Sequence, residues 1–291
     1  MAVPMTNPEK AVLSRVKEFR MTDGDFARIQ KYAMEHTGIS LSGQKKEMIY
    51  SRLAKRIRLL KLEDFSTYCD LLSDHSEQEI SNFVNAITTN LTSFFREEHH
   101  FEFLKETVVR DLKEWHQTDG KVRVWSAGCS TGEEPYSIAI ALSEAMLNGA
   151  QWDIKVLATD LDTCVLKHGS DGVYDVERLE DVPERRVRRF FRHGRKENSN
   201  KVYVKDCVRN MISFKQLNLM KDWPMRGKFD VIFCRNVVIY FDKPTQRILF
   251  DRYANALRSG GYLFIGHSEN LNGVSDRFES LGRTIYRKGL D

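Results

Sequence analysis

The chain has 291 residues, of which 41% are hydrophobic and 30% are charged, and its formal net charge is +4. This composition is typical of a soluble globular protein, and no apolar run approaches the roughly 20 residues that a membrane-spanning helix needs. The five cysteines are scattered without a Cys-x-x-Cys pair and the histidines lack metal-ligand spacing, which argues against a disulfide framework and a zinc site. We expect a cytoplasmic protein without a secretory signal, a membrane-inserted segment or a bound metal.

Helical patterns fill the first third of the chain. Thr22 and Asp25 have the spacing of a helix-capping pair ahead of a run of apolar residues at helical spacing, and Gly38 stands where that helix should end. Further amphipathic patterns continue to about residue 90. We predict a flexible lead-in over residues 1–20 and an all-helical domain over residues 21–95.

The second predicted helix of this domain is strongly basic, because basic residues far outnumber acids between Lys45 and Lys61. The residues predicted to form its basic surface are Lys45, Arg52, Lys55, Arg56 and Arg58. Such a surface indicates an acidic macromolecular partner. The alternative is a helix face that is simply solvated.

Strands alternate with helices from Lys121 onward, which predicts a doubly wound parallel sheet. The predicted strands are Val122–Trp125, Ile154–Ala158, Met211–Phe214, Phe229–Cys234 and Gly261–Ile265, with an antiparallel edge strand at 284–286. We assign residues 96–291 to this second domain. The strand and helix rhythm breaks at about residues 172–210, which predicts a small inserted β-subdomain.

The first strand is followed by a small-residue turn through Gly128 and Gly132 and by a helix that starts at Glu133 and Glu134. This arrangement brings backbone N–H groups close to a ligand at the strand's carboxyl end. The next strand ends at Asp160, which can accept two hydrogen bonds from a ribose diol. The paired acids disfavour a pyrophosphate, and the G-x-x-x-G spacing disfavours a nicotinamide dinucleotide. A ligand with an ammonium group, such as S-adenosylmethionine, fits better.

A series of short motifs occurs in order along the chain. They are TNLTSFFRE at Thr89–Glu97, WSA at Trp125–Ala127, STGEEPYS at Ser130–Ser137, FCRNV at Phe233–Val237 and GHSE at Gly266–Glu269. Together they resemble the CheR family of chemotaxis receptor methyltransferases, and the resemblance covers about residues 22 to 288. It implies a doubly wound, Rossmann-like SAM-dependent methyltransferase domain that carries the helical domain and the inserted β-subdomain.

The family resemblance also implies an activity and a set of site residues. Methyl transfer from S-adenosylmethionine to glutamate side chains of chemoreceptors would yield methyl esters and S-adenosylhomocysteine. The residues implied to contact the cofactor are Asn90, Thr92, Arg96, Glu134, Asp160, Asn218, Leu219, Arg235 and Asn236. Arg96 and Tyr240 would lie near the transferred methyl. The basic surface of the helical domain would dock acidic helices of the receptor.

The residue types agree with this chemistry. A glutamate has a pKa of about 4.3, so it is already an anion at neutral pH and needs no general base. The enzyme has to align the carboxylate oxygen, methyl and sulfur for in-line displacement and to exclude water. We expect Arg96 and Tyr240 to orient the incoming carboxylate.

Several alternatives remain at this stage. A nucleic-acid methyltransferase would also explain the basic patches, and a noncatalytic receptor adaptor would need a lost cofactor site. We expect a monomer that binds no nucleic acid and is recruited to receptor arrays at the membrane. The sequence leaves open which receptors and glutamates are used, and whether the inserted β-subdomain binds a receptor C-terminal peptide.

Overall fold

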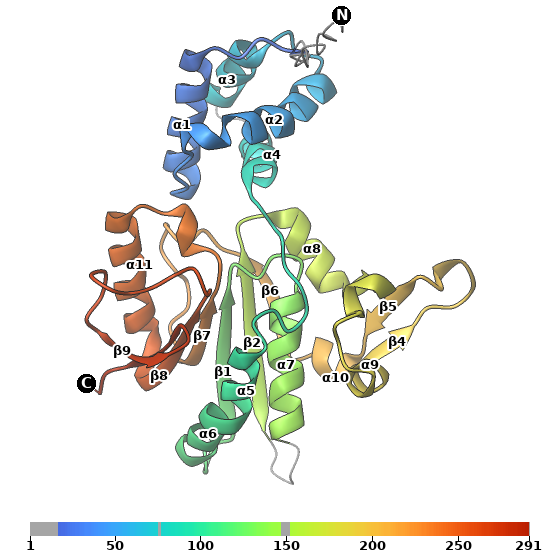
Figure 1. Cartoon of the computed structure of the whole chain (residues 1–291), viewed down its shortest axis with the longest axis vertical. Helices are drawn as coiled ribbons and strands as arrows, with labels where there is room; N and C mark the ends of the chain where they lie inside the picture. Colours follow the sequence, from blue (N-terminus) through green and yellow to red (C-terminus); the bar gives the residue numbers. More distant parts are fainter. Residues whose placement is uncertain (1–16, 75–76, 147–151, 291) are drawn as a thin grey trace, which may run out of the picture.

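The computed structural model describes residues 17–74, 77–146 and 152–290. Most of the lead-in predicted over residues 1–20 lies outside these ranges. Figure 1 shows a helical domain stacked on one end of a larger domain with a central sheet, and a small second sheet that projects from its side. None of the described helices is both long and apolar enough to cross a membrane.

The helical domain is built from amphipathic helices that pack around a shared apolar core. They are α1 (Asp23–Thr37), α2 (Lys46–Leu60), α3 (Phe65–Ser73) and α4 (Glu77–Ile87), with a 3-10 turn η1 (Gly43–Lys45) ahead of α2. Each contributes fully buried side chains, among them Ile29, Leu53, Tyr68 and Phe83.

The predicted ends of the first helix are confirmed. The Thr22 hydroxyl accepts the Asp25 N–H, and the Asp25 carboxylate accepts the Thr22 N–H, so two otherwise unpaired donors are satisfied. Gly38 ends α1 with a φ of 74°, a conformation that glycine adopts without steric cost.

The segment after α4 runs into the larger domain and forms one interrupted helix. Its parts are α5 (His99–Phe103), a π-helical turn η2 (Leu104–Val108) and α6 (Val109–Trp115). The apolar residues Phe101, Leu104, Val108 and Leu112 have the spacing of a regular helix. The π turn is a departure that apolar spacing alone does not reveal.

The central sheet has the strand order β6-β2-β1-β7-β8-β10-β9. Its strands are β1 (Lys121–Ala127), β2 (Asp153–Asp160), β6 (Ile212–Gln216), β7 (Phe229–Cys234), β8 (Leu257–Ile265), β9 (Phe278–Gly282) and β10 (Ile285–Lys288). The five neighbouring strands β6, β2, β1, β7 and β8 are parallel, which confirms the doubly wound sheet. The strand predicted at 284–286 is antiparallel, but the sheet edge is β9 and not β10.

Helices cover both faces of the sheet. Val124 on β1 belongs to the apolar cluster formed with α7 (Glu133–Ala145) and the interrupted helix. Its neighbour Trp125 belongs to the cluster formed with α11 (Lys243–Ala256) on the opposite face. Alternate residues of one strand therefore face different helical layers, so both faces of the sheet are covered.

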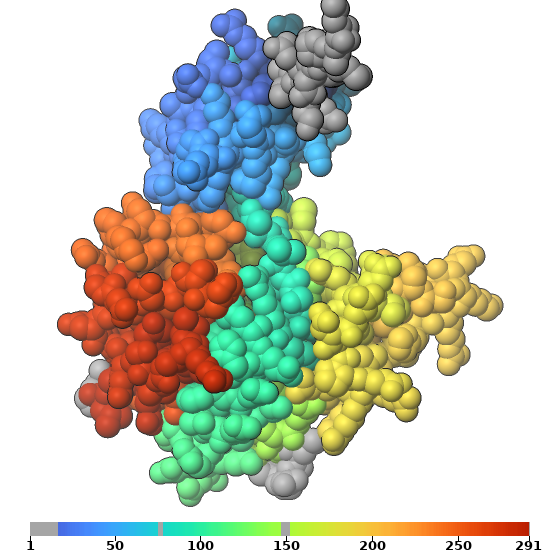
Figure 2. Space-filling view, viewed as in Figure 1, coloured from blue at the N-terminus to red at the C-terminus, as the bar shows by residue number. Residues whose placement is uncertain are grey.

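The inserted subdomain contains a three-stranded antiparallel sheet of order β3-β5-β4, which confirms its predicted β character. Its elements are β3 (Val173–Asp175), η3 (Val176–Leu179), α9 (Glu184–Phe190), β4 (Phe191–His193), η4 (Lys196–Asn198), β5 (Lys201–Val204) and α10 (Asp206–Arg209), and it follows α8 (Thr163–Asp171). Figure 2 shows it protruding from the rest of the surface. Phe94 packs edge-on against Tyr174 and Phe191 and anchors it to the main domain.

Candidate functional site

A cavity of about 260 Å³ lies between the carboxyl edge of the sheet and the helical domain. The helical domain contributes Thr37, Ile39, Leu41, Lys45, Met48 and Ile87 to its lining. The segment Thr88–Thr92, which joins the two domains, forms another wall. The cavity is therefore assembled only when both domains are in place.

Every residue predicted to bind the cofactor lines this cavity. They are Asn90, Thr92, Arg96, Glu134, Asp160, Asn218, Leu219, Arg235 and Asn236. Tyr240, predicted to lie near the transferred methyl, lines it as well. The structure thus brings together side chains that are far apart in the sequence and belong to different strands, helices and loops.

The turn after β1 needs a glycine. Gly128 has a φ of 85°, and a Cβ atom there would lie 2.3 Å from Cγ2 of Val237. The same turn continues to Ser130, whose N–H donates to Asp160 at 2.8 Å, while the N–H of Asp162 donates to its other oxygen at 3.0 Å. Burial raises the pKa of Asp160, and these two N–H groups oppose the shift. They hold the carboxylate at the cavity wall.

Glu134, in the first turn of α7, faces the cavity. One oxygen accepts the Ser126 hydroxyl at 2.7 Å and the other accepts Nη1 of Arg235 at 3.2 Å. Burial raises the pKa of Glu134, and the charge of Arg235 opposes the shift. The adjacent Glu133 does not line the cavity, because its carboxylate contacts Thr131 and Arg178.

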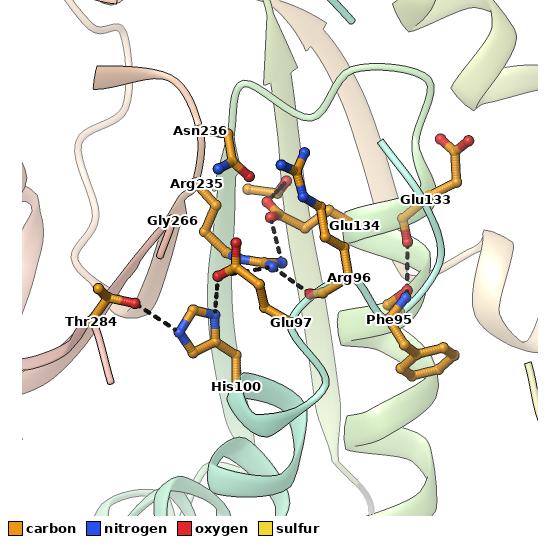
Figure 3. A network of polar contacts seen from close by, with 12 residues as sticks. Phe95, Arg96, Glu97, His100, Glu133, Glu134, Arg235, Asn236, Gly266 and Thr284 are labelled. Carbon is orange, nitrogen blue, oxygen red and sulfur yellow. Dashed lines mark hydrogen bonds and ion pairs between the residues drawn. The ribbon is translucent and has the colours of Figure 1, made fainter. Parts of the chain in front are cut away.

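Arg235 is the centre of a buried polar network at the floor of the cavity (Figure 3). Besides Glu134, its guanidinium lies 3.4 Å from Glu97 and donates to the backbone carbonyl of Arg96. Burial works to raise the pKa of Glu97, but the charge of Arg235 and the contact with His267 lower it. The network therefore joins β7, α7 and the segment that carries Arg96.

His100 extends the network away from the cavity. Its Nε2 lies 3.0 Å from the carbonyl of Arg283 and 3.2 Å from the Thr284 hydroxyl, so this nitrogen donates its proton there. Nδ1 faces Glu97 at 3.5 Å. Burial, and then the charge of Arg235, lower the pKa of His100 to about 4. The imidazole is neutral at pH 7.

Glu97, His99 and His100 also bring potential metal-ligand atoms within 4.8 Å of one another. A cation there would meet the guanidinium of Arg235, which already pairs with Glu97. We therefore assign Glu97, His99 and His100 a structural role, in which they support the wall of the cavity. No role was predicted for Glu97 or His100 from the sequence, although Glu97 ends the motif Thr89–Glu97.

The helical domain is tied to the sheet domain by hydrogen bonds around the cavity. Asn218 donates to the carbonyl of His36 at 2.7 Å, and the N–H of Ser40 donates to the carbonyl of Tyr240 at 2.9 Å. Lys45 lies above the Tyr240 ring, 4.9 Å from its centre. Asn218 and Tyr240 thus belong to the junction between the domains as well as to the cavity.

The structure divides the predicted basic surface of α2. Arg52 donates to the carbonyl groups at the end of α4, and Arg56 pairs with the buried carboxylate of Glu79. Lys55 and Arg58 are exposed, and Arg58 pairs with Glu18. Arg52 and Arg56 are half-buried, and their side chains also hold the helical domain together. Their part in docking a receptor stays a prediction.

Comparison with known families identifies the fold. Residues 24–88 match the family profile described as CheR methyltransferase, all-alpha domain, and residues 90–287 match CheR methyltransferase, SAM binding domain. The chain belongs to the CheR methyltransferase family. It is therefore a SAM-dependent methyltransferase, as the sequence predicted, and the noncatalytic adaptor is set aside.

Curated relatives of this CheR chain span nearly its whole length. Chemotaxis protein methyltransferase 2 of Pseudomonas aeruginosa is 46% identical over 93% of this chain and 95% of its own. The chemotaxis protein methyltransferase of Escherichia coli is 40% identical over 96% of each chain. A solved complex of geranyl diphosphate methyltransferase with SAM aligns with a TM-score of 0.33 and 16% identity, over 58% of this chain and 48% of that chain.

The protonation of His100 predicts how the stability of this methyltransferase depends on pH. Its pKa is about 4 in the folded chain against a usual 6.5, so the folded state binds fewer protons in this window. The free energy of unfolding should fall as pH drops from 6.5 toward 4, by about 3 kcal/mol in total. Urea unfolding at a series of pH values measures it.

His100→Gln is the matched variant, because its amide can still donate to the Arg283 carbonyl but does not titrate. The variant should lose this part of the pH dependence. Parallel stability profiles for the two proteins would contradict the assignment.

Proposed function

We propose that this enzyme transfers the methyl group of S-adenosylmethionine to glutamate side chains of chemoreceptors, forming methyl esters and S-adenosylhomocysteine. The observation that carries the proposal is the cavity, where all the predicted cofactor residues meet beside Arg96 and Tyr240. Relatives named chemotaxis protein methyltransferases, 40% to 46% identical over most of the chain, support the choice of acceptor.

The lining of the cavity suits this cofactor. Asp160 offers a fixed carboxylate for a ribose diol, and Glu134 offers a second carboxylate for an ammonium group. Apolar side chains such as Leu217 and Leu219 can cover an aromatic base. S-adenosylmethionine supplies an electrophilic methyl on a sulfonium centre when it is bound.

The protein's own task is to bring an ionised carboxylate to this cavity and to keep water out. Arg96 lies at the cavity with Nη1 donating to the Leu91 carbonyl at 3.0 Å, and a guanidinium has further N–H groups for an incoming carboxylate. Tyr240 lines the same cavity and carries a phenolic hydroxyl. Positioning of this kind can supply about 7–11 kcal/mol. No general base is needed, because the acceptor carboxylate is already ionised at neutral pH.

Cofactor binding can be tested with two adjacent acids. Glu134→Gln removes a charge that faces the cavity, so we expect S-adenosylhomocysteine to bind at least about tenfold more weakly, since a hydrogen bond to a charged group contributes about 1.5–3 kcal/mol. Isothermal calorimetry measures the affinity.

Glu133→Gln is the control for this experiment, because Glu133 is also buried and lies in the same helical turn but contacts Thr131 and Arg178 instead. Its affinity should stay close to that of the wild type. Equal losses in both variants would argue against a specific role for Glu134.

Methyl transfer can be tested with labelled S-adenosylmethionine and membranes that contain chemoreceptors. The wild type should label the receptor, and mild base should release the label as it does from an ester. Arg96→Ala should lower turnover about 100-fold, because the acceptor carboxylate is no longer oriented. Base-stable label, or label on added RNA instead of receptor, would refute the proposed acceptor, and wild-type turnover by the variant would remove the role of Arg96.

The receptor would dock on the exposed part of the basic surface. Lys55 and Arg58 are solvent-exposed on α2, and Lys45 lies at the cavity on the adjoining turn. Positive charge beside the cavity complements acidic receptor helices and would guide a glutamate toward it.

Charge reversal at neighbouring positions separates docking from folding. Lys55→Glu should raise the receptor KM about threefold, the scale of a surface charge pair, and leave the free energy of unfolding within about 0.5 kcal/mol. Arg56→Glu should destabilise the helical domain by about 3 kcal/mol, because it replaces the arginine that pairs with the buried Glu79 by a like charge. Steady-state kinetics and thermal unfolding measure the two effects, and an unchanged KM for Lys55→Glu would exclude it from the docking surface.

A further inference from the structure

The loop Gly266–Glu269 after β8 carries one of the sequence motifs, yet it does not line the cavity. It lies behind the cavity wall and contacts two segments that do line it. One is the turn Asn236–Tyr240 after β7, and the other is the segment that carries Arg96 and Glu97.

Glu269 holds the turn after β7 through its backbone. Its side chain is buried, and one carboxylate oxygen accepts the N–H of Gly266 at 2.6 Å and of Asn236 at 2.9 Å. The other oxygen accepts the N–H of Ile239 at 3.2 Å. A single carboxylate therefore spans the turn from its first residue to the one before Tyr240.

The turn needs this support because of its backbone. Asn236 has a φ of 60°, in the left-handed region that non-glycine residues rarely occupy. Gly266 permits the close approach of the loop, since a Cβ atom there would lie 2.5 Å from the Asn236 amide nitrogen Nδ2 and 2.8 Å from its backbone nitrogen. Strained backbone of this kind persists only where the surroundings hold it.

The same loop reaches the other side of the cavity through His267. One oxygen of Glu97 accepts the backbone N–H of His267 at 3.3 Å and lies 3.0 Å from its Nδ1. Glu97 also has a positive φ, of 58°, and its second oxygen pairs with Arg235. The loop is thus joined to the segments of both residues expected at the methyl group, Arg96 and Tyr240.

We propose that Glu269 is a positioning residue for methyl transfer, which holds Asn236 and Tyr240 in register with the cofactor by accepting three N–H groups behind the cavity. The inference rests on the proposed function, because it requires the cavity to take S-adenosylmethionine. Glu269 touches neither cofactor nor substrate and acts only through the turn.

Glu269→Gln is the primary test. An amide has one oxygen and one NH₂ group, so it cannot accept all three N–H groups, and its own donors face backbone donors. We expect S-adenosylhomocysteine to bind more weakly and kcat to fall at least about tenfold, because a displacement of about 1 Å at a reacting centre can cost about 100-fold. Calorimetry and the receptor-labelling assay at saturating substrate measure the two quantities.

Asp230→Asn is the matched control. Asp230 is also buried and accepts a backbone N–H, that of Arg123 at 2.8 Å, but it stands at the opposite end of β7. The control should lower Tm without changing kcat or cofactor affinity. A purely structural role for Glu269 would give the same pattern in both variants and would overturn the inference.

A second variant covers the case in which Glu269→Gln does not fold. Gly266→Ala keeps the carboxylate but pushes a methyl group against Asn236, so it should also lower cofactor affinity and kcat. Wild-type values for this variant would overturn the inference. Failure of the wild type to label receptors would count against the proposed acceptor alone, because the S-adenosylhomocysteine titration needs no receptor and still tests Glu269.

Discussion

The structure depends most on a single buried guanidinium, that of Arg235. Its side chain is 2% exposed, and it is held by the carboxylates of Glu134 and Glu97 and by the backbone carbonyl of Arg96. Removing a charge from water is costly, and here two opposite charges and a carbonyl offset that cost. These contacts join the end of β7, the start of α7 and the segment that leads to the helical domain. The floor of the cavity is the place where the three meet.

The helical domain forms the second wall of this cavity. Parallel sheets place ligands at their carboxyl edge, but an open edge would leave a reactive donor exposed to water. Here α1, the turn before α2 and the segment after α4 close over the edge, and they are joined to it by contacts such as that between Ser40 and Tyr240. Some residues that hold the two domains together, such as Asn218 and Tyr240, thus also line the cavity.

Much of the fold was predictable because local chemistry and global packing agree. The nearly continuous apolar run Phe229–Cys234 is the strand β7 with the same limits, since a strand covered on both faces is mostly apolar. By contrast, β9 was missed, because only Phe278 of its residues is buried and its pattern resembles a loop. The contacts of Arg52 and Arg56 with α4 were not predicted either, since a helical pattern gives a side chain's direction but not the partner that it meets.

Patterns in the sequence were enough to predict a helical domain and a doubly wound sheet, and its motifs, which resemble the CheR family, predicted residues that line the cavity. The two domains were predicted from the hydrophobic periodicity of their helices and strands, and the cavity residues from short sequence motifs. Which carboxylates face the cavity and which stand behind it could be seen only once the chain was folded. Glu133 and Glu134 are adjacent residues of the same type, yet Glu133 pairs with Arg178 and Glu134 with Arg235. The arginines of α2 likewise differ in their partners. The reason is physical: a buried charge takes its role from the groups around it, and those come from distant parts of the chain.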